Sequence, residues 1–239
     1  MQVIIHAGVH CTDEDRILKC LLRNADSWRH GGVAIPGPSK YRKFLLDVVN
    51  SVSKSAISND TREIVLDAIL DEDHEEVDRL ILSHASLFSV PKLMFEDGRV
   101  YRKAEMRLQT MQRIFAGDDL ELHLGLRDPA TFLPAAFAAT PHRDFRSFMS
   151  GVDPMQLRWS DLIRRIRDQS PDVPITLWCN EDTPLVWGEV IRKMAGIEMS
   201  RKITGAFDVF SQIISPEGMK RFRAFLAENP NVNEPQKRR

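Results

Sequence analysis

The sequence lacks the features that mark several large classes of protein. Of its 239 residues only three are cysteines, Cys11, Cys20 and Cys179, which are too few and too scattered for a disulfide framework. We therefore expect reduced thiols in a cytoplasmic protein. No apolar run approaches the ~20 residues of a membrane span, and the first residues carry no basic segment of a signal peptide. The formal net charge of −1 supplies no field for nucleic acid or an anionic membrane, so neither is an expected partner.

Short apolar runs alternate with amphipathic helical patterns along the chain. Four runs are typical of buried strands in a parallel sheet, and they span residues 2–7, 79–84, 121–126 and 174–180. Apolar residues at three- and four-residue spacing predict helices around them. The expected helices span residues 14–29, 41–52, 61–70, 104–115, 155–168 and 185–197. This alternation predicts an α/β fold of three layers, with a mostly parallel central sheet flanked by helices.

No repeat or domain boundary interrupts this pattern, so we expect a single domain over residues 1–228. Residues 229–239 are polar, contain proline and end in basic side chains, which predicts a disordered tail. Residues 30–40 (HGGVAIPGPSK) are rich in glycine and proline and are expected to form a surface loop. The acidic run over residues 71–78 is expected to be a solvated loop or helix end.

The stretch HAGVHCTDED, residues 6–15, joins the first strand to the first expected helix. A helix N-terminus attracts phosphate groups, and phosphate-binding turns add glycines and a lysine. This stretch has Gly8 and Thr12, but Cys11 stands where the lysine would be expected. Thr12 is predicted to cap the helix, with Asp15 returning the bond as in a capping box.

Three consecutive carboxylates, Asp13, Glu14 and Asp15, follow Thr12. They suit the positive end of a helix dipole, but they oppose an incoming polyanion. One like-charge contact at ~4 Å costs about 4 kcal/mol at an effective dielectric of ~20. The carboxylates, His6 and His10 do not have the spacing of a zinc motif, so no metal site is expected.

The order of these features resembles the bacterial sulfotransferase family. The opening stretch is similar to that family's strand, its H-I-G-x-H-K-T-G-T-T-S turn and the helix that follows. LILSHASLF is similar to the family's second strand, and LGLRDPATFLPAAFAA to its strand and helix L-R-N-P-x-x-x-x-x-S-x-Y. ITLWCNEDTPLVWGEVIRKMAGI is similar to a later strand, acidic loop and helix. The resemblance covers about residues 2–197.

This resemblance implies a P-loop-like fold and transfer of a sulfuryl group from 3′-phosphoadenosine 5′-phosphosulfate to a hydroxyl or amine. By position it implies that the main chain from Gly8 to Thr12, including His10 and Cys11, would hold the 5′-phosphosulfate. Arg127 would pair with the 3′-phosphate, a contact that suits a guanidinium group.

The sequence departs from the family's pattern at the donor-binding positions. The family's lysine falls at Cys11, and its glycine and hydroxyl residues fall at the three carboxylates. The serine that joins the arginine on the 3′-phosphate falls at Ala135. The glutamate of the second strand falls at Ala85, which leaves His84 as the nearest ionisable group.

Two hypotheses follow. The first is a divergent sulfotransferase with His10 or His84 as general base and an unidentified small-molecule or protein acceptor. The alternative is a non-catalytic binding or interaction protein on the same scaffold. Because the departures fall on donor-binding residues and spare the strand and helix patterns, we favour lost donor binding. A homodimer is compatible with helical surfaces rich in arginine and glutamate.

Overall fold

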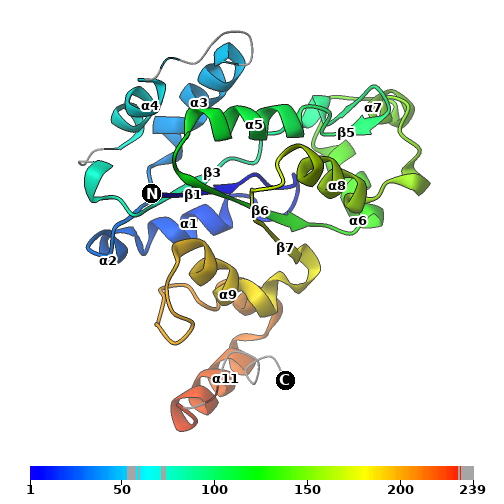
Figure 1. Cartoon of the computed structure of the whole chain (residues 1–239). Coiled ribbons are helices and arrows are strands. Elements are labelled where there is room, and N and C mark those ends of the chain that lie inside the picture. The colour runs from blue at the N-terminus through cyan, green and yellow to red at the C-terminus, as the bar shows by residue number, and fades with distance from the viewer. Residues whose placement is uncertain (53–57, 59, 71–73, 231, 233–239) are drawn as a thin grey trace.

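The computed structural model describes residues 1–52, 58, 60–70, 74–230 and 232, and a five-stranded sheet lies at its centre (Figure 1). The strands are parallel and lie in the order β2-β3-β1-β6-β7. Their bounds are β1 Gln2–His6, β2 Val33–Ala34, β3 Arg79–Ser83, β6 Asp119–Leu126 and β7 Ile175–Cys179. The four strands predicted from apolar runs are confirmed as β1, β3, β6 and β7.

The central strand β1 contributes side chains to two separate hydrophobic cores, because successive side chains of a strand point to opposite faces of the sheet. Val3 and Ile5 belong to one core and Ile4 to the other. None of the three is more than 1% exposed. The sheet is therefore the middle layer of three, and the predicted α/β fold is confirmed.

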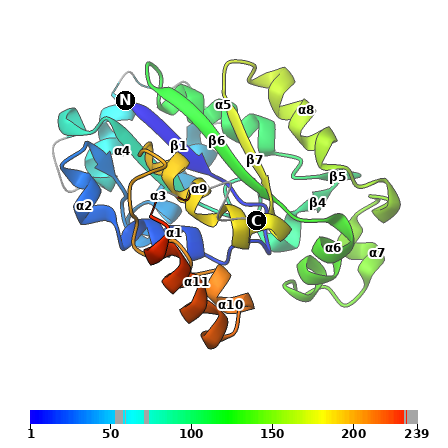
Figure 2. The same ribbon diagram turned by 90° about the horizontal axis from the view of Figure 1, so that it is seen from below.

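Helices cover both faces of the sheet (Figures 1 and 2). The helices packed on the face of Val3 and Ile5 are α3 (Pro38–Val52), α4 (Thr61–Ile69), α5 (Ala104–Ile114), α6 (Pro129–Ala138) and α8 (Trp159–Gln169). The helices on the opposite face are α1 (Arg16–Leu22), α2 (Ala25–Arg29) and α9 (Thr183–Ala195). Short 3₁₀ turns lie at η1 (His74–Glu76), η2 (Pro91–Leu93), η3 (Pro154–Gln156) and η4 (Asn180–Asp182).

The single helix expected over residues 14–29 is wrong, since the chain forms α1 and α2 with a break at Asn24. The Asn24 Nδ2 group donates to the carbonyl oxygens of Cys20 (2.8 Å) and Thr204 (2.9 Å). Its Oδ1 atom accepts from the Thr204 N–H group at 2.8 Å. An asparagine side chain can compete in this way with the hydrogen bonds of a helix. The break thereby fastens the C-terminal segment around Thr204 to α1.

Two short pieces of sheet were not expected. Residues 30–40 are not wholly a loop, because β2 lies within them and pairs with the first residues of β3. A small antiparallel hairpin joins β4 (Phe95–Glu96) to β5 (Arg99–Val100). Strands of two residues are too short for an alternating pattern to reveal them. Within the acidic run 71–78, residues 74–76 form η1, and residues 71–73 lie outside the described residues.

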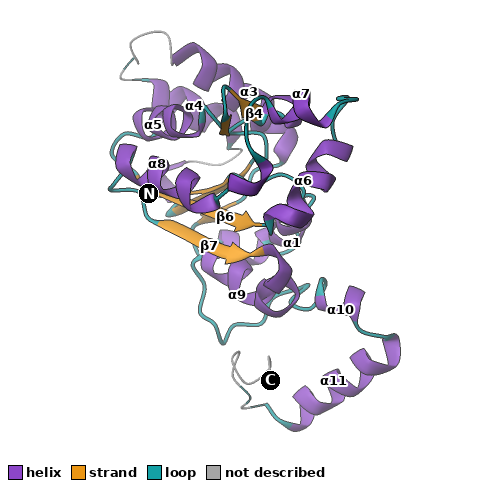
Figure 3. Ribbon diagram, turned by 90° about the vertical axis from the view of Figure 1, so that its right-hand side faces the viewer, coloured by secondary structure: helices purple, strands orange, loops and turns teal. Residues whose placement is uncertain are grey.

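The periodicity did not predict three of the helices. α7 (Phe145–Met149) follows α6 in the middle of the chain, and α10 (Phe210–Ile213) and α11 (Pro216–Glu228) follow α9. Figure 3 shows α11 outside the three layers. The ring of Phe222 on α11 lies 5.2 Å from that of Phe207 and 5.1 Å from that of Phe210. Among the described residues, no helix is both long and apolar enough to cross a bilayer. Most of the tail predicted over 229–239 lies outside the described residues.

Candidate functional site

The first turn, residues 7–15, leaves β1 at the carboxyl edge of the sheet and leads into α1. Its first residues stay beside β6, because the Ala7 N–H donates to the His123 carbonyl (3.2 Å) and the Val9 N–H donates to the Gly125 carbonyl (3.0 Å). Ligands of open α/β sheets bind at this edge of the strands. The turn therefore lies where the fold would place a site.

Gly8 has a φ of +93°, a backbone conformation that side chains with a Cβ rarely adopt. A Cβ at this position would also lie 3.3 Å from the main-chain nitrogen of His10 and 3.6 Å from the main chain of Ala85. Glycine is thus required to bring the turn close to the chain after β3. A cleft of about 380 Å³ opens beside it, lined by the turn, by Arg42 of α3 and by residues 84–86.

The capping predicted for Thr12 and Asp15 is wrong. The Thr12 hydroxyl donates to the Val9 carbonyl at 2.7 Å, and α1 begins only at Arg16. Asp13 does the capping instead, because its Oδ2 atom accepts from the Ile17 N–H at 3.1 Å. Three residues of the turn that are not glycine, Cys11, Glu14 and Asp15, have positive φ values, so their backbone is left-handed. Such conformations are costly for residues other than glycine.

Asp15 is held by Arg42, a residue that the sequence did not single out. The Arg42 Nη1 atom donates to Asp15 Oδ2 at 2.9 Å, and Nη2 donates to Oδ1 at 2.6 Å. The third donor, Nε, bonds to the Ser83 carbonyl at 3.0 Å. The hydrogen bonds from Arg42 hold the pKa of Asp15 below its usual range. The guanidinium beside the cleft is therefore already paired with a carboxylate of the turn itself.

His10 is fixed by Tyr101, which follows β5. The Tyr101 hydroxyl accepts from the His10 main-chain N–H (3.0 Å) and lies 2.8 Å from Nδ1 of the ring. The other ring nitrogen, Nε2, is buried and has no hydrogen-bond partner among the described residues. Burial lowers the pKa of His10 to about 4. His10 is thus neutral near pH 7, and its Nδ1 atom is held by Tyr101.

Both ring nitrogens of His84 are engaged as well. Nε2 lies 3.1 Å from the Arg42 carbonyl, to which it donates, and Nδ1 accepts from the Ser86 N–H at 3.3 Å. Burial lowers the pKa of His84 to about 4. His84 therefore has no free nitrogen that could accept a proton from an acceptor hydroxyl. His10 is 7% exposed and does not line the cleft.

Arg127 follows β6 and does reach the first turn. Its Nη1 atom donates to the Cys11 carbonyl at 2.7 Å, and its Nε atom donates to the Thr131 hydroxyl at 3.1 Å. The Arg127 carbonyl accepts from the indole N–H of Trp159 at 2.6 Å. The structure therefore brings Arg127 together with the turn, where it supports the main chain at Cys11. Burial raises the pKa of the Cys11 thiol, which keeps it protonated and a poor nucleophile.

The structure thus gathers all six predicted site residues, Gly8, His10, Cys11, Thr12, His84 and Arg127, around one turn. Sequence reasoning missed Arg42 and Tyr101, which hold that turn from α3 and from the segment after β5. Arg42 gave no signal because it lies within an ordinary amphipathic helix. Among the described residues, no three His, Cys, Asp or Glu side chains are grouped as a metal site would need.

No protein-family model matches the sequence, and no curated protein matches it. Solved structures with a similar chain path include a sulfotransferase from Alicyclobacillus acidocaldarius, with 13% identity and a TM-score of 0.48, over 97% of this chain and 92% of that one. Another is a retinol dehydratase in complex with androsterone and inactive cofactor PAP, with 10% identity and a TM-score of 0.34, over 94% of this chain and 65% of that one. At these values the likeness does not extend to the roles of individual residues.

Proposed function

We propose that this chain is a non-catalytic binding protein on a sulfotransferase-like scaffold, and that its first turn does not accept 3′-phosphoadenosine 5′-phosphosulfate. The observation that carries the proposal is the two-pronged pair between Asp15 and Arg42. Arg42, the cation that lines the cleft beside this turn, is neutralised by the turn's own carboxylate.

An incoming phosphosulfate would have to displace Asp15 from Arg42 and leave that carboxylate beside it. A like-charge contact at ~4 Å costs about 4 kcal/mol at an effective dielectric of ~20. The helix dipole returns only about 0.3–1 kcal/mol per charge, and α1 has just seven residues. The balance of these terms is against donor binding.

Sulfuryl transfer would also need a cation on the leaving oxygen and a base on the acceptor. Position 11 supplies a thiol whose pKa is raised by burial, instead of a cation. Both ring nitrogens of His84 are already hydrogen-bonded, and His10 is buried and does not line the cleft. The turn therefore offers neither group to the reaction.

Calorimetric titration of the full chain with 3′-phosphoadenosine 5′-phosphate tests the proposal. We expect no binding up to about 1 mM. A Cys11→Lys, Asp13→Gly variant keeps the Asp15–Arg42 pair and should not bind either. Adding Asp15→Ser frees the Arg42 guanidinium and should yield binding near the millimolar range.

Two outcomes would contradict the proposal. One is micromolar binding by the natural chain that is lost in Arg127→Ala and retained in Arg146→Ala, an exposed arginine on α7. The other is a triple variant that folds, as judged by circular dichroism, and still does not bind. In that case the Asp15–Arg42 pair is not what closes the turn.

A further inference from the structure

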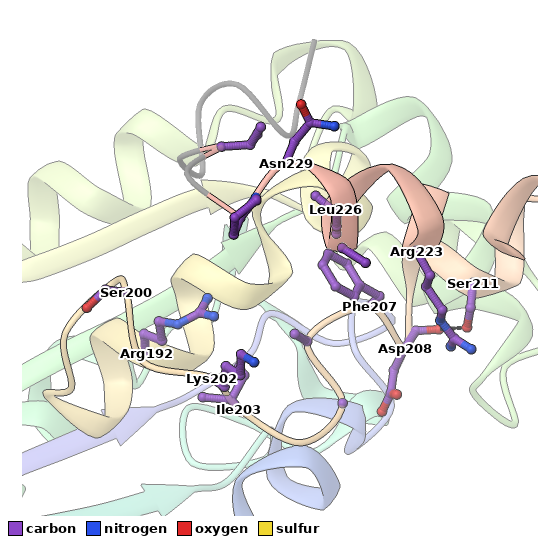
Figure 4. Close-up of a pocket in the computed structure, with 15 residues that line it drawn as sticks. Arg192, Ser200, Lys202, Ile203, Phe207, Asp208, Ser211, Arg223, Leu226 and Asn229 are labelled. Atoms are coloured by element: carbon purple, nitrogen blue, oxygen red, sulfur yellow. Dashed lines mark hydrogen bonds between the residues drawn. The ribbon is translucent and has the colours of Figure 1, made fainter. Parts of the chain in front are cut away.

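A second cavity lies between α9, the segment 200–208 and the C-terminal half of α11 (Figure 4). Its volume is about 600 Å³, within the range of pockets that hold organic ligands. It shares no lining residue with the cleft at the first turn. Anything that binds here is therefore independent of the proposal made for that turn.

The middle of the cavity is apolar. Ile203 and Phe207 contribute from the segment 200–208, and Leu226 contributes from α11. Figure 4 shows the side chain of Leu226 next to the ring of Phe207. A surface of this kind gains free energy by covering hydrocarbon, at roughly 25 cal/mol per Å² buried.

One wall of the cavity is held in place by side chains from other elements. The indole N–H of Trp187, a residue buried in α9, donates to the Gly205 carbonyl at 2.9 Å. Asn24 bonds to both the N–H and the carbonyl of Thr204. The Phe207 ring packs edge-on against Phe222 of α11. The wall is thus preformed, which reduces the entropy that a ligand must lose on binding.

Two cations lie at the ends of this apolar surface. Lys202 is at one end and Arg223 at the other, with Phe207 between them (Figure 4). Within the part of the chain that the structure describes, neither side chain has a hydrogen bond or an ion pair. The one carboxylate that lines the cavity, Asp208, is paired with Arg23. The lining therefore carries positive charge that the described residues leave uncompensated.

Arg192, the third basic residue of the lining, serves a different purpose. Its Nε atom donates to the Arg201 carbonyl at 2.8 Å and its Nη1 atom to the Gly188 carbonyl at 3.0 Å. It is 5% exposed and braces the main chain. The charge available to a ligand therefore comes from Lys202 and Arg223.

We infer that this cavity binds an organic anion with an extended apolar body, of the class of medium-chain carboxylates. The apolar centre gives no hydrogen bonds to a simple inorganic anion, and the cationic ends offer nothing to a neutral or cationic chain. An anionic head on Lys202 or Arg223 with its hydrocarbon over Phe207 and Leu226 satisfies both features.

Three ligands with the same ten-carbon chain separate charge from hydrophobicity: decanoate, decanol and decyltrimethylammonium. Calorimetric titration of the full chain, below micelle-forming concentrations, is expected to give binding of decanoate. The other two should bind at least about tenfold more weakly, because they lose the charge-assisted contact. Lys202→Gln or Arg223→Gln should each weaken decanoate binding, by up to about tenfold for the residue that holds the carboxylate.

Arg221→Gln is the matched control, since Arg221 lies on the same helix, pairs with Glu217 and does not line the cavity. It should leave binding unchanged, and so should Arg42→Gln at the first turn. Absence of decanoate binding would overturn the inference. So would equal binding of decanol, or decanoate binding that neither Lys202→Gln nor Arg223→Gln weakens.

Discussion

The Tyr101 hydroxyl bonds to two atoms of one residue, the main-chain nitrogen of His10 at 3.0 Å and its ring Nδ1 at 2.8 Å. Tyr101 is 1% exposed and has a φ of +48°, and its ring stacks on Trp159 at 6.4 Å. Trp159 in turn bonds to the Arg127 carbonyl, and Arg127 bonds to Cys11. The middle of the first turn is therefore held by a closed circuit of contacts from three segments.

Tyr101→Phe should destabilise the protein by about 1–3 kcal/mol. The change removes one oxygen and leaves a buried N–H and a buried ring nitrogen of His10 without partners, which is the costly way to lose a hydrogen bond. Urea denaturation at pH 7 measures the free energy of unfolding. The hydroxyl of Tyr41, the other tyrosine, also hydrogen-bonds to the main chain, at Ser83. Tyr41→Phe should therefore lower the free energy of unfolding by an amount similar to Tyr101→Phe. A Tyr101→Phe variant as stable as the natural chain would contradict the circuit.

The stability of the protein should fall as the pH is lowered from about 7 to about 4. Burial lowers the pKa of His10 and His84 from an ordinary 6.5 to about 4. Between these values the unfolded chain binds more protons than the folded one, so acid favours unfolding. A lowering of this size amounts to about 3 kcal/mol for each histidine. Urea denaturation across this pH range gives the slope.

His84→Gln should make this slope shallower, because the variant has one buried imidazole fewer to protonate. His30→Gln is the control, since His30 is exposed at the end of α2, and it should leave the slope unchanged. If the free energy of unfolding of His84→Gln falls with pH as steeply as that of the natural chain, the acid sensitivity does not come from His84.

Gly125→Ala should destabilise the protein by about 1–3 kcal/mol through overpacking. Gly125 of β6 lies beside Trp178 of β7 in the sheet register, and a Cβ at Gly125 would lie 2.9 Å from two carbons of the indole ring. Thermal denaturation should show the loss, and the tryptophan emission should shift as Trp178 moves. Gly37→Ala is a suitable control, because nothing lies within 4 Å of a Cβ at that position.

A double-mutant cycle of Asp15→Asn and Arg42→Gln should give a coupling energy of up to about 1 kcal/mol. The value is modest because the Asp15 side chain is 43% exposed, and solvent screens the attraction. Coupling should shrink in 1 M salt, where the screening length falls to about 3 Å. The exposed pair of Arg221 and Glu217, at 3.5 Å, should show almost none. Coupling at the first turn no larger than at that pair would count against the role given to Arg42.

The strands of the core were predictable because both of their faces are buried, so their sequences are rich in apolar residues. β1, β3 and β6 read as apolar runs for that reason, and α5 and α9 as periodic stripes. β2 and the β4–β5 hairpin are too short for any period to show. The aromatic residues of α11 pack on Phe207 and Phe210, contacts that only the folded chain creates.

The members of the first turn were predictable, but their bonds were not. The order of residues from Gly8 to Thr12 pointed to this turn, and the ends of β3 and β6 pointed to His84 and Arg127. Asp15 was expected to cap a helix, yet it binds Arg42, which lies in α3 and is brought near by the chain crossing to β3. Local sequence carries no signal for a partner supplied by another layer.

The central position of β1 has a consequence for how the chain is made. β1 leaves the ribosome before its two neighbours in the sheet, which begin only at Arg79 and Asp119. Until β6 has emerged, an apolar strand has no partner along one edge, and long-range pairing of this kind is slow and exposed to aggregation. A nascent chain stalled before Leu126 should therefore depend on chaperones that hold apolar segments, whereas a chain released after β6 should not.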